Sequence, residues 1–189
     1  MDPTAKAPLR AATRAARRAL SPAQRHEASE RIVARLLALP ELQAAGTLLL
    51  YAALSEEVDL AGMVEPVHAR GHRTLFPRVR GAELELVAAA DLRALRLGHR
   101  GVREPVGASV DPAVVTLAVV PGVAFDPRGG RLGGGGGHYD RLLPRLPADT
   151  PTIGVAYACQ LVPRVPREPH DASVDLVVTE RGVHRAQRT

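Results

Sequence analysis

Short, continuous apolar runs alternate with segments of helical periodicity along this chain. The runs span residues 47–54, 114–125 and 152–158, and such a run is typical of a strand that is buried on both faces. A strand of this kind needs helices above and below it, and strands that alternate with helices form mainly parallel sheets. The alternation therefore predicts an α/β protein with a mainly parallel sheet.

The helical segments have recognisable starts and stops. Residues 5–20 are rich in Ala and Arg, and a second helix, which reaches residue 39, opens at the capping-box pattern Ser21-Pro22-Ala23-Gln24. Asp59 can cap a third helix, which ends at Gly71. The remaining assignments are strands at 74–79 (interrupted by Pro77), 83–87 and 175–179 (the last strand), a helix at 139–146, and turn-rich sequence at 91–112.

The length and composition of the chain fit one ordinary domain. The 189 residues are 46% apolar, which is enough for a sizeable core. The sequence has no internal repeat and no linker long enough to separate two domains. We therefore expect residues 1–189 to form a single three-layer, Rossmann-like domain, in which helices cover both faces of the sheet.

Composition also argues against several classes of protein. Aromatic residues make up only 3% of the chain and Trp is absent, which disfavours a platform that stacks single-stranded nucleic acid. The single cysteine, Cys159, excludes an intramolecular disulfide and a cysteine-based zinc finger. No signal-peptide pattern is visible, and no apolar run approaches the ~20 residues that span a membrane. We therefore expect a cytoplasmic protein that binds neither membranes nor nucleic acid, and its net charge of +5 favours anionic ligands.

The sequence FDPRGGRLGGGGGHYDR, residues 125–141, carries the clearest functional signal. A buried strand leads into two clusters of glycines and then into a helix. Glycines let backbone N–H groups approach an anion closely, and the helix N-terminus adds a favourable dipole. Because ligands of open α/β sheets bind at the carboxyl ends of strands, the segment predicts a phosphate-binding loop. Its Gly-His-Tyr ending differs from the Gly-Lys-Ser/Thr ending of a Walker A loop.

This segment resembles the signature of the 5-formyltetrahydrofolate cyclo-ligases, or methenyltetrahydrofolate synthetases, which reads roughly FDxxGxRLGxGxGYYDR. The resemblance covers nearly the whole chain and implies ATP- and Mg²⁺-dependent cyclisation of 5-formyltetrahydrofolate to 5,10-methenyltetrahydrofolate, with release of ADP and phosphate through a phosphorylated formyl (imidate) intermediate. The other matching blocks are Lys6-x-x-x-Arg10, Glu57-Val58, Phe76-Pro77-Arg78, Gly101-Val102-Arg103-Glu104-Pro105, Ala156-Tyr157-x-x-Gln160 and Pro169-His170-Asp171-x-x-x-Asp175.

The resemblance also implies which residues form the site. Lys6 and Arg131 are the expected catalytic residues, and Asp140 and Asp171 the expected Mg²⁺ ligands, with Asp126 as an alternative ligand. The expected ATP contacts are Lys6, Arg10, Arg131, Leu132, Gly133, Gly134, Gly135, Gly136, Gly137, His138 and Tyr139. The expected folate contacts are Ala52, Glu57, Gly135, Gly137, His138 and Tyr139.

These residue types suit that chemistry. Lys6, Arg10 and Arg14 are spaced four apart, so in a helix they share one face that can reach phosphates, although Arg14 is also compatible with a solvated face. Arg131 stands at the loop entrance and can pair bidentately with phosphate oxygens. Glu57 follows a strand end, where its carboxylate can accept from pterin N–H donors or start a helix. Mg²⁺ takes one or two carboxylates together with substrate phosphates and water.

The chain departs from the family pattern at several positions. His138 replaces the usual first Tyr of Tyr-Tyr-Asp, and Gly134 and Gly136 stand where relatives often carry polar side chains. If the first helix began only at Pro8, the four-residue spacing would no longer place Lys6 on that face, and Lys6 would then reach the nucleotide from an extended arm. As an N-terminal surface side chain, Lys6 is expected to contribute little to stability. We expect a monomer with small-molecule substrates; the alternatives are a non-catalytic folate- or nucleotide-binding relative of the enzyme and, less favoured, a nucleic-acid-binding domain.

Overall fold

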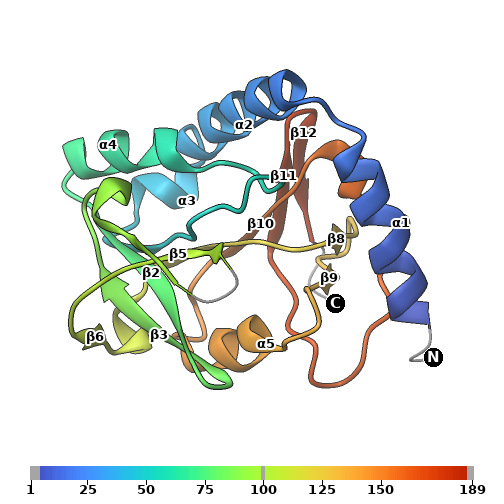
Figure 1. The fold of residues 1–189 in the computed structure, drawn as a ribbon. Helices are drawn as coiled ribbons and strands as arrows, with labels where there is room; N and C mark the ends of the chain where they lie inside the picture. Colours follow the sequence, from blue (N-terminus) through green and yellow to red (C-terminus); the bar gives the residue numbers. More distant parts are fainter. Residues whose placement is uncertain (1–4, 99–100, 187–189) are drawn as a thin grey trace.

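Eight strands form one mixed sheet at the centre of the computed structural model, which describes residues 5–98 and 101–186 (Figure 1). The strand order is β12-β11-β10-β7-β1-β2-β3-β6. The five parallel strands are β11 (Leu176–Thr179), β10 (Thr152–Val155), β7 (Leu117–Val120), β1 (Thr47–Leu49) and β2 (Arg73–Arg80). The antiparallel strands at the two edges are β12 (Gly182–Arg185) and the pair β3 (Glu83–Ala88) and β6 (Ser109–Val110).

Side chains that alternate along the strands enter two separate cores. Leu48 and Leu50 belong to the core under the helices α2 (Pro22–Leu37), α3 (Pro40–Gln43) and α4 (Ala61–Ala69). Leu49, between them, belongs to the core on the opposite face, which α5 (His138–Leu142) covers (Figure 1). Helices thus lie on both faces of a mainly parallel sheet, so the predicted three-layer, Rossmann-like α/β fold is confirmed.

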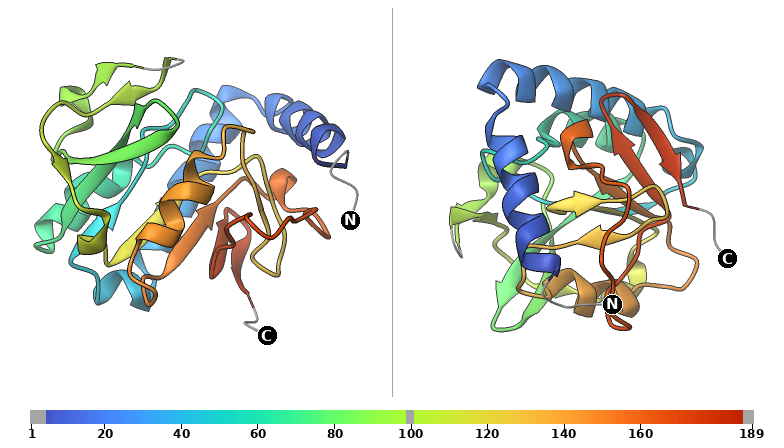
Figure 2. Two further views of the ribbon diagram at one scale, coloured as in Figure 1. Left: turned by 90° about the horizontal axis from the view of Figure 1, so that it is seen from below. Right: turned by 90° about the vertical axis from the view of Figure 1, so that its right-hand side faces the viewer.

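The helix α1 (Lys6–Arg18) lies outside these layers. Its Leu9 packs against a small third core that contains Ala124, Leu132 and Val165. This core belongs to the two-stranded ribbon of β8 (Ala124–Phe125) and β9 (Arg131–Leu132), and Figure 2 shows α1 beside that ribbon. The N-terminal helix and the glycine-rich segment are therefore neighbours, although more than a hundred residues separate them in the sequence.

The helix boundaries agree closely with the sequence pattern. The α1 helix begins at Lys6, so Pro8 lies in its first turn, where the missing N–H needs no partner. The capping box at the start of α2 is confirmed, because the Ser21 side chain accepts from Gln24 N–H and the Gln24 side chain accepts from Ser21 N–H. The N-cap of α4 is Leu60 rather than the expected Asp59, which lies one residue earlier; its carboxylate nevertheless accepts from Ala61 N–H at 2.9 Å.

All three strands predicted from apolar runs are shorter than those runs, and the run 152–158 forms a strand only as far as Val155. The run 47–54 forms a strand only as far as Leu49, and the run 114–125 is divided between β7 and β8 by the segment 121–123. Pro121 has no N–H for the ladder, and β8 pairs with β9 instead of joining the main sheet. An apolar run in the sequence indicates buried residues, and residues can stay buried after the backbone has left the sheet.

Pro77 does not interrupt its strand, contrary to the prediction. It lies opposite Leu86 in a continuous ladder between β2 and β3. The N–H of Val79, two residues later, points away from β3 and donates to Glu104 Oε1 at 3.1 Å. Backbone nitrogens two residues apart in a strand point the same way, so the Pro77 nitrogen also faces away from β3. On that side β1 pairs with β2 only as far as Leu75, so the ladder needs no N–H at Pro77.

The remaining differences are short elements. The strand β11 is not the last one, because β12 follows it, and the helix expected at 139–146 is α5 followed by the 3-10 turn η5 (Leu143–Arg145), which contains Pro144. The turn-rich region 91–112 includes β4 (Arg96–Leu97), β5 (Arg103–Glu104) and β6. Within residues 5–98 and 101–186, no helix combines the length and the apolar character needed to cross a membrane.

Candidate functional site

The strand order reverses between β1 and β7. From β1 the chain crosses to β2 on one side, whereas β7 leads to β10 and β11 on the other side. Open α/β sheets bind ligands in the crevice at the carboxyl ends of the two strands that flank such a reversal. A cavity of about 460 Å³ lies there, lined by residues after β1, including Tyr51 and Glu57, and by 121–123 after β7.

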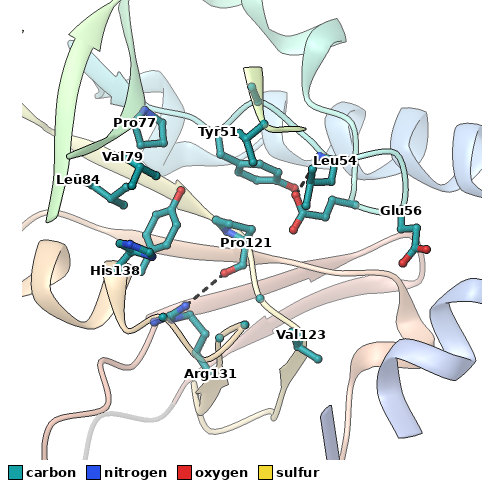
Figure 3. Close-up of a pocket in the computed structure, with 18 of the residues that line it drawn as sticks. Tyr51, Leu54, Glu56, Pro77, Val79, Leu84, Pro121, Val123, Arg131 and His138 are labelled. Carbon is teal, nitrogen blue, oxygen red and sulfur yellow. Dashed lines mark hydrogen bonds between the residues drawn. The ribbon is translucent and has the colours of Figure 1, made fainter. Parts of the chain in front are cut away.

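We call this space the tyrosine cavity, after Tyr51 and Tyr139 in its lining. Figure 3 shows Pro77, Val79 and Leu84 on one side of it, with Leu54 and Glu56 toward the other. Apart from its charged groups, the lining is largely apolar, and Tyr51 and Tyr139 contribute aromatic rings. Its size and character suit a flat organic ligand.

The Glu57 carboxylate is the main acidic group in the lining of the tyrosine cavity. Its Oε2 accepts from Leu54 N–H at 3.0 Å. Burial raises the pKa of Glu57, although this hydrogen bond and the nearby Arg17 partly oppose the shift. Burial and the charge of Glu57 together raise the pKa values of Tyr51 and Tyr139, so both phenols stay neutral. Glu57 is thus an acceptor for ligand N–H groups in a desolvated place.

A second cavity of about 470 Å³, the lysine cavity, lies on the other side of the glycine loop. Lys6, Arg10, Glu168 and Asp171 line it. Four residues line both cavities, and all belong to the glycine loop or to the start of α5: Gly133, Gly136, Gly137 and Asp140. The loop therefore forms a thin common wall between two spaces.

The predicted cationic face of α1 is confirmed. Arg10 Nε donates to Gly133 O at 2.9 Å, and Arg14 donates to Gly134 O at 3.3 Å, so Arg14 is not simply a solvated residue. Lys6 Nζ lies 2.5 Å from Glu168 and 2.6 Å from Asp171. Burial opposes the charge of Lys6, but hydrogen bonds to these two carboxylates outweigh it and raise the Lys6 pKa. Burial likewise opposes the charge of Asp171, and the Lys6 hydrogen bond outweighs it and lowers the Asp171 pKa.

The structure corrects the expected position of Arg131. Its side chain is only 2% exposed and lies beneath the loop rather than at its entrance. The guanidinium donates to Asp140 at 2.6 Å and to Pro121 O at 3.4 Å, and it lies over the Tyr139 ring at 5.6 Å. Arg131 therefore contacts a ligand only at the edge of the tyrosine cavity, and otherwise acts through Asp140.

Asp126 is not placed as a metal ligand. It is 2% exposed, and backbone N–H groups of Arg128, Gly130 and Val165 donate to its two oxygens at 2.8–3.0 Å. A Cβ at Gly130 would lie 2.3 Å from this carboxylate, so the glycine makes room for Asp126 rather than for a ligand. Asp126 organises the turn between β8 and β9.

The other two predicted metal ligands fit a hard divalent cation. Asp140 and Asp171 line the lysine cavity, where phosphate oxygens and water can complete the octahedral shell that Mg²⁺ prefers. Arg131 and the Ala172 N–H both donate to Asp140 Oδ1. Lys6 and the Glu168 N–H both donate to Asp171 Oδ2. Each carboxylate thus keeps a second oxygen that accepts no hydrogen bond from the described residues. Glu168 and His170 lie beside Asp171, with ligand atoms within 4.8 Å of one another.

The structure separates residues that the sequence analysis assigned to both ligands. His138 and Tyr139 line only the tyrosine cavity of the two, Gly135 lines only the lysine cavity, and Gly137 lines both. Among the residues assigned to one ligand, Leu132 lines the lysine cavity and Ala52 the tyrosine cavity, but Gly134, which was assigned to ATP, lines the tyrosine cavity. Site-lining residues that sequence reasoning missed include Tyr51, Glu56, Arg17, Arg18 and Glu168. Glu56 and Glu168 each stood next to a recognised block, whereas Tyr51 lies inside an apolar run, and Arg17 and Arg18 are indistinguishable from the many other arginines.

Comparisons with known proteins agree with this geometry. The 5-formyltetrahydrofolate cyclo-ligase of Escherichia coli (strain K12) is 30% identical over 170 residues, which cover 86% of this chain and 93% of that one, and the mouse enzyme (Mus musculus) is 26% identical with 94% of each chain covered. The NMR structure of Aquifex aeolicus 5,10-methenyltetrahydrofolate synthetase superposes with a TM-score of 0.84 at 38% identity, covering 97% of this chain and 94% of that one. The 5,10-methenyltetrahydrofolate synthetase from Mycoplasma pneumoniae gives a TM-score of 0.78 at 26% identity, covering 95% of this chain and 99% of that one.

The family model for 5-formyltetrahydrofolate cyclo-ligases matches residues 2–180. Together with the fold, the glycine loop and the paired cavities, this match makes the chain a member of the 5-formyltetrahydrofolate cyclo-ligase family.

Proposed function

We propose that this protein is an ATP- and Mg²⁺-dependent 5-formyltetrahydrofolate cyclo-ligase that forms 5,10-methenyltetrahydrofolate, ADP and phosphate. The observation that carries the proposal is the common wall of Gly133, Gly136, Gly137 and Asp140 between the two cavities. A reaction between two bound molecules requires that their reacting atoms meet, and a wall made largely of glycine backbone lets them approach from both sides.

In this proposal the lysine cavity takes the nucleotide. Lys6 and Arg10 from α1 supply positive charge, and backbone N–H groups of the glycine loop approach the phosphates. Asp140 and Asp171 would hold Mg²⁺ through the carboxylate oxygens that accept no hydrogen bond within the part of the chain that the structure describes, and the ion would neutralise charge on the phosphates. Lys6, now between Glu168 and Asp171, would exchange one carboxylate partner for a phosphate oxygen.

The tyrosine cavity takes the folate. Tyr51 and Tyr139 offer apolar aromatic surface to the pterin ring, and Pro77, Val79 and Leu84 extend that surface. Glu57 accepts hydrogen bonds from pterin N–H groups, where a carboxylate acceptor is stronger than a neutral one. His138, in place of the usual Tyr of the family signature, lines the same cavity.

The chemistry needs no protein nucleophile. The formyl oxygen attacks the γ-phosphorus, the bond to ADP breaks, and an imidate phosphate forms. N10 of the folate then attacks the activated carbon and loses its proton to solvent or to the departing phosphate, and phosphate leaves with the former formyl oxygen. The protein positions the two substrates and neutralises the charge that develops on the phosphoryl group, with Lys6 as the mobile cation and Asp140 held in place by Arg131.

The family match over residues 2–180 supports a single cyclo-ligase domain that spans the chain. We infer further that this domain acts as a monomer in the cytoplasm on small-molecule substrates. The competing proposal, a non-catalytic folate- or nucleotide-binding relative, predicts binding without turnover.

A spectrophotometric assay distinguishes the two proposals. Purified protein is mixed with 5-formyltetrahydrofolate, ATP and Mg²⁺, and the methenyl chromophore is followed, with each component omitted in turn. Our proposal predicts product only in the complete mixture, with one ADP formed for each product. Binding of both ligands without product would support the non-catalytic relative, and ATP hydrolysis that is independent of folate would contradict the proposed reaction.

A further inference from the structure

Tyr157 and Gln160 form a sequence block that contributes no side chain to the candidate site. Tyr157 is 1% exposed and Gln160 is 2% exposed. Neither residue lines the tyrosine cavity or the lysine cavity. Both follow β10, in and beside the 3-10 turn η6 (Ala158–Gln160), and both are nonetheless hydrogen-bonded to segments that do line the tyrosine cavity.

Tyr157 holds the loop that carries Glu57. Its hydroxyl donates to the backbone oxygen of Glu57 at 2.9 Å. Because its only hydroxyl proton is used there, the contact with Ser29 Oγ at 3.3 Å has Ser29 as the donor. Ser29 Oγ in turn accepts from Asp59 N–H at 3.1 Å. The hydroxyls of α2 and of the segment after β10 thus fix the backbone on both sides of Val58.

Gln160 holds the opposite wall of the same cavity. Its Nε2 donates to Gly122 O and to Val123 O, each at 3.0 Å, and these residues follow β7. Its Oε1 accepts from Tyr157 N–H at 3.0 Å. The two side chains are therefore linked to each other as well as to one wall each. A shift in this turn would move the Glu57 loop and the 121–123 segment together.

We propose that Tyr157 and Gln160 are positioning residues that set the distance across the tyrosine cavity between Glu57 and the 121–123 segment. The inference rests on the proposed function, in which this cavity takes the folate. The buried Gln160 side chain donates to two carbonyls, and it makes both hydrogen bonds in only one orientation. The Tyr157 phenol ends a chain of hydroxyls, and it too makes its hydrogen bonds in only one orientation. The pair therefore acts on folate binding without touching the folate.

Tyr157→Phe is the primary test, because it removes one hydroxyl and keeps the ring. Loss of this hydrogen bond should raise the KM for 5-formyltetrahydrofolate about tenfold and leave the KM for ATP within about twofold.

Thr150→Val is the matched control. Thr150 is equally buried, its hydroxyl donates to Val115 O at 3.0 Å, and it lines neither cavity of the proposed site. The control should lower the melting temperature by a similar amount without the selective change in folate KM.

A double-mutant cycle tests whether Tyr157 acts through Glu57. In a Glu57→Gln background the folate effect of Tyr157→Phe should shrink, because the acceptor that Tyr157 positions has lost its charge. Gln160→Met, which removes the contacts to the opposite wall, should also raise the folate KM selectively. If Tyr157→Phe behaves like Thr150→Val in an otherwise active enzyme, or if its effect is fully additive with Glu57→Gln, the inference is overturned. A wild-type protein without cyclo-ligase activity would instead overturn the proposed function.

Discussion

The two cavities on either side of the glycine loop are held together by different forces. Around the tyrosine cavity, backbone groups are fixed by neutral donors, such as the Tyr51 hydroxyl on Val58 O at 2.7 Å. Around the lysine cavity, side chains are fixed by charge, with Lys6 between Glu168 and Asp171 and Arg10 on the loop backbone. The tyrosine cavity is shaped mainly by packing, although ion pairs such as Arg17–Glu56 also line it, and the lysine cavity is shaped mainly by ion pairs.

This difference determines how each cavity can respond to a ligand. A cavity shaped by buried tyrosines and prolines keeps its form when a ligand enters, so its residues select by fit. A cavity shaped by ion pairs already contains the charges that a phosphate or a metal ion would meet. An anion that binds there must replace a carboxylate as the partner of a cationic side chain, so binding changes which charged groups are paired. Substitutions on each side of the loop can separate these two behaviours.

The largest effect should come from the buried ion pair beneath the common wall. Asp140→Ala leaves the Arg131 guanidinium, whose side chain is 2% exposed, without its charged partner. Breaking such a pair typically costs about 3–5 kcal/mol in the free energy of unfolding. Chemical denaturation measures this, with Glu27→Ala, at an exposed pair on α2, as a nearly neutral control. Adding Arg131→Met to Asp140→Ala should recover part of the loss; if the double variant is the less stable of the two, the pair is not the cause.

Glu57→Gln should separate the two cavities by ligand. Replacing the carboxylate should weaken folate binding by about 1.5–3 kcal/mol and leave ATP binding unchanged. Isothermal titration with each ligand alone tests this prediction. An equal loss for both ligands would remove Glu57 from the folate side.

The same substitution carries a pH dependence with a defined sign. Because burial raises the pKa of Glu57, the native state holds its proton more tightly than the unfolded state does, and the wild type loses stability as the pH rises through that raised pKa. Glu57→Gln removes this loss. The variant should therefore gain stability relative to the wild type as the pH rises above the ordinary glutamate pKa of about 4.3, and a difference that does not change with pH there would contradict burial of the Glu57 carboxyl as the cause.

Substitutions of Lys6 should act on turnover. Lys6→Ala should lower kcat by at least ~10-fold, about 1.4 kcal/mol in the barrier, and Lys6→Arg should not restore it, because a planar guanidinium does not fit where an ammonium meets two carboxylates. Lys6 is only 8% exposed, so the expectation of a surface side chain is wrong, and melting curves of Lys6→Ala should show a decrease. Arg18→Ala, on the same helix but at the tyrosine cavity, is the control for ATP affinity. Wild-type turnover in Lys6→Arg would exclude Lys6 from phosphate contact.

The smallest effects should come from the exposed part of the glycine loop. A Cβ at Gly134 would lie within 4 Å of Arg14 alone, at 3.8 Å, and the φ of Gly134 lies outside the left-handed region. Gly134→Ala should therefore leave the melting temperature nearly unchanged and change each KM by less than about twofold. Gly129 is the contrast, because its φ is +79° and a Cβ there would lie 2.1 Å from Val174 O. Gly129→Ala should therefore unfold the loop, as a loss of melting temperature would show. Equal tolerance at both positions would mean that the two glycine clusters do not differ in this way.

The sequence predicts the fold and the nucleotide side better than it predicts the folate side. Strand–helix alternation, the capping box and the four-residue spacing of Lys6, Arg10 and Arg14 are local patterns with one structural meaning. The tyrosine cavity depends on where β1 and β7 leave the sheet, at Leu49 and Val120, inside apolar runs that continue without a break. The burial of Arg131 is a tertiary property of the same kind, since only the fold places it under the glycine loop.

An isotope experiment tests the central claim, that the two cavities deliver their ligands to a shared wall for direct transfer between them. The protein converts 5-formyltetrahydrofolate labelled with ¹⁸O in the formyl group, in the presence of ATP and Mg²⁺, and the released phosphate is analysed by mass spectrometry. Attack of the formyl oxygen on the γ-phosphorus predicts one ¹⁸O atom in each phosphate released with product. Product formed with unlabelled phosphate would mean that water or another group receives the phosphoryl group, and would contradict direct transfer.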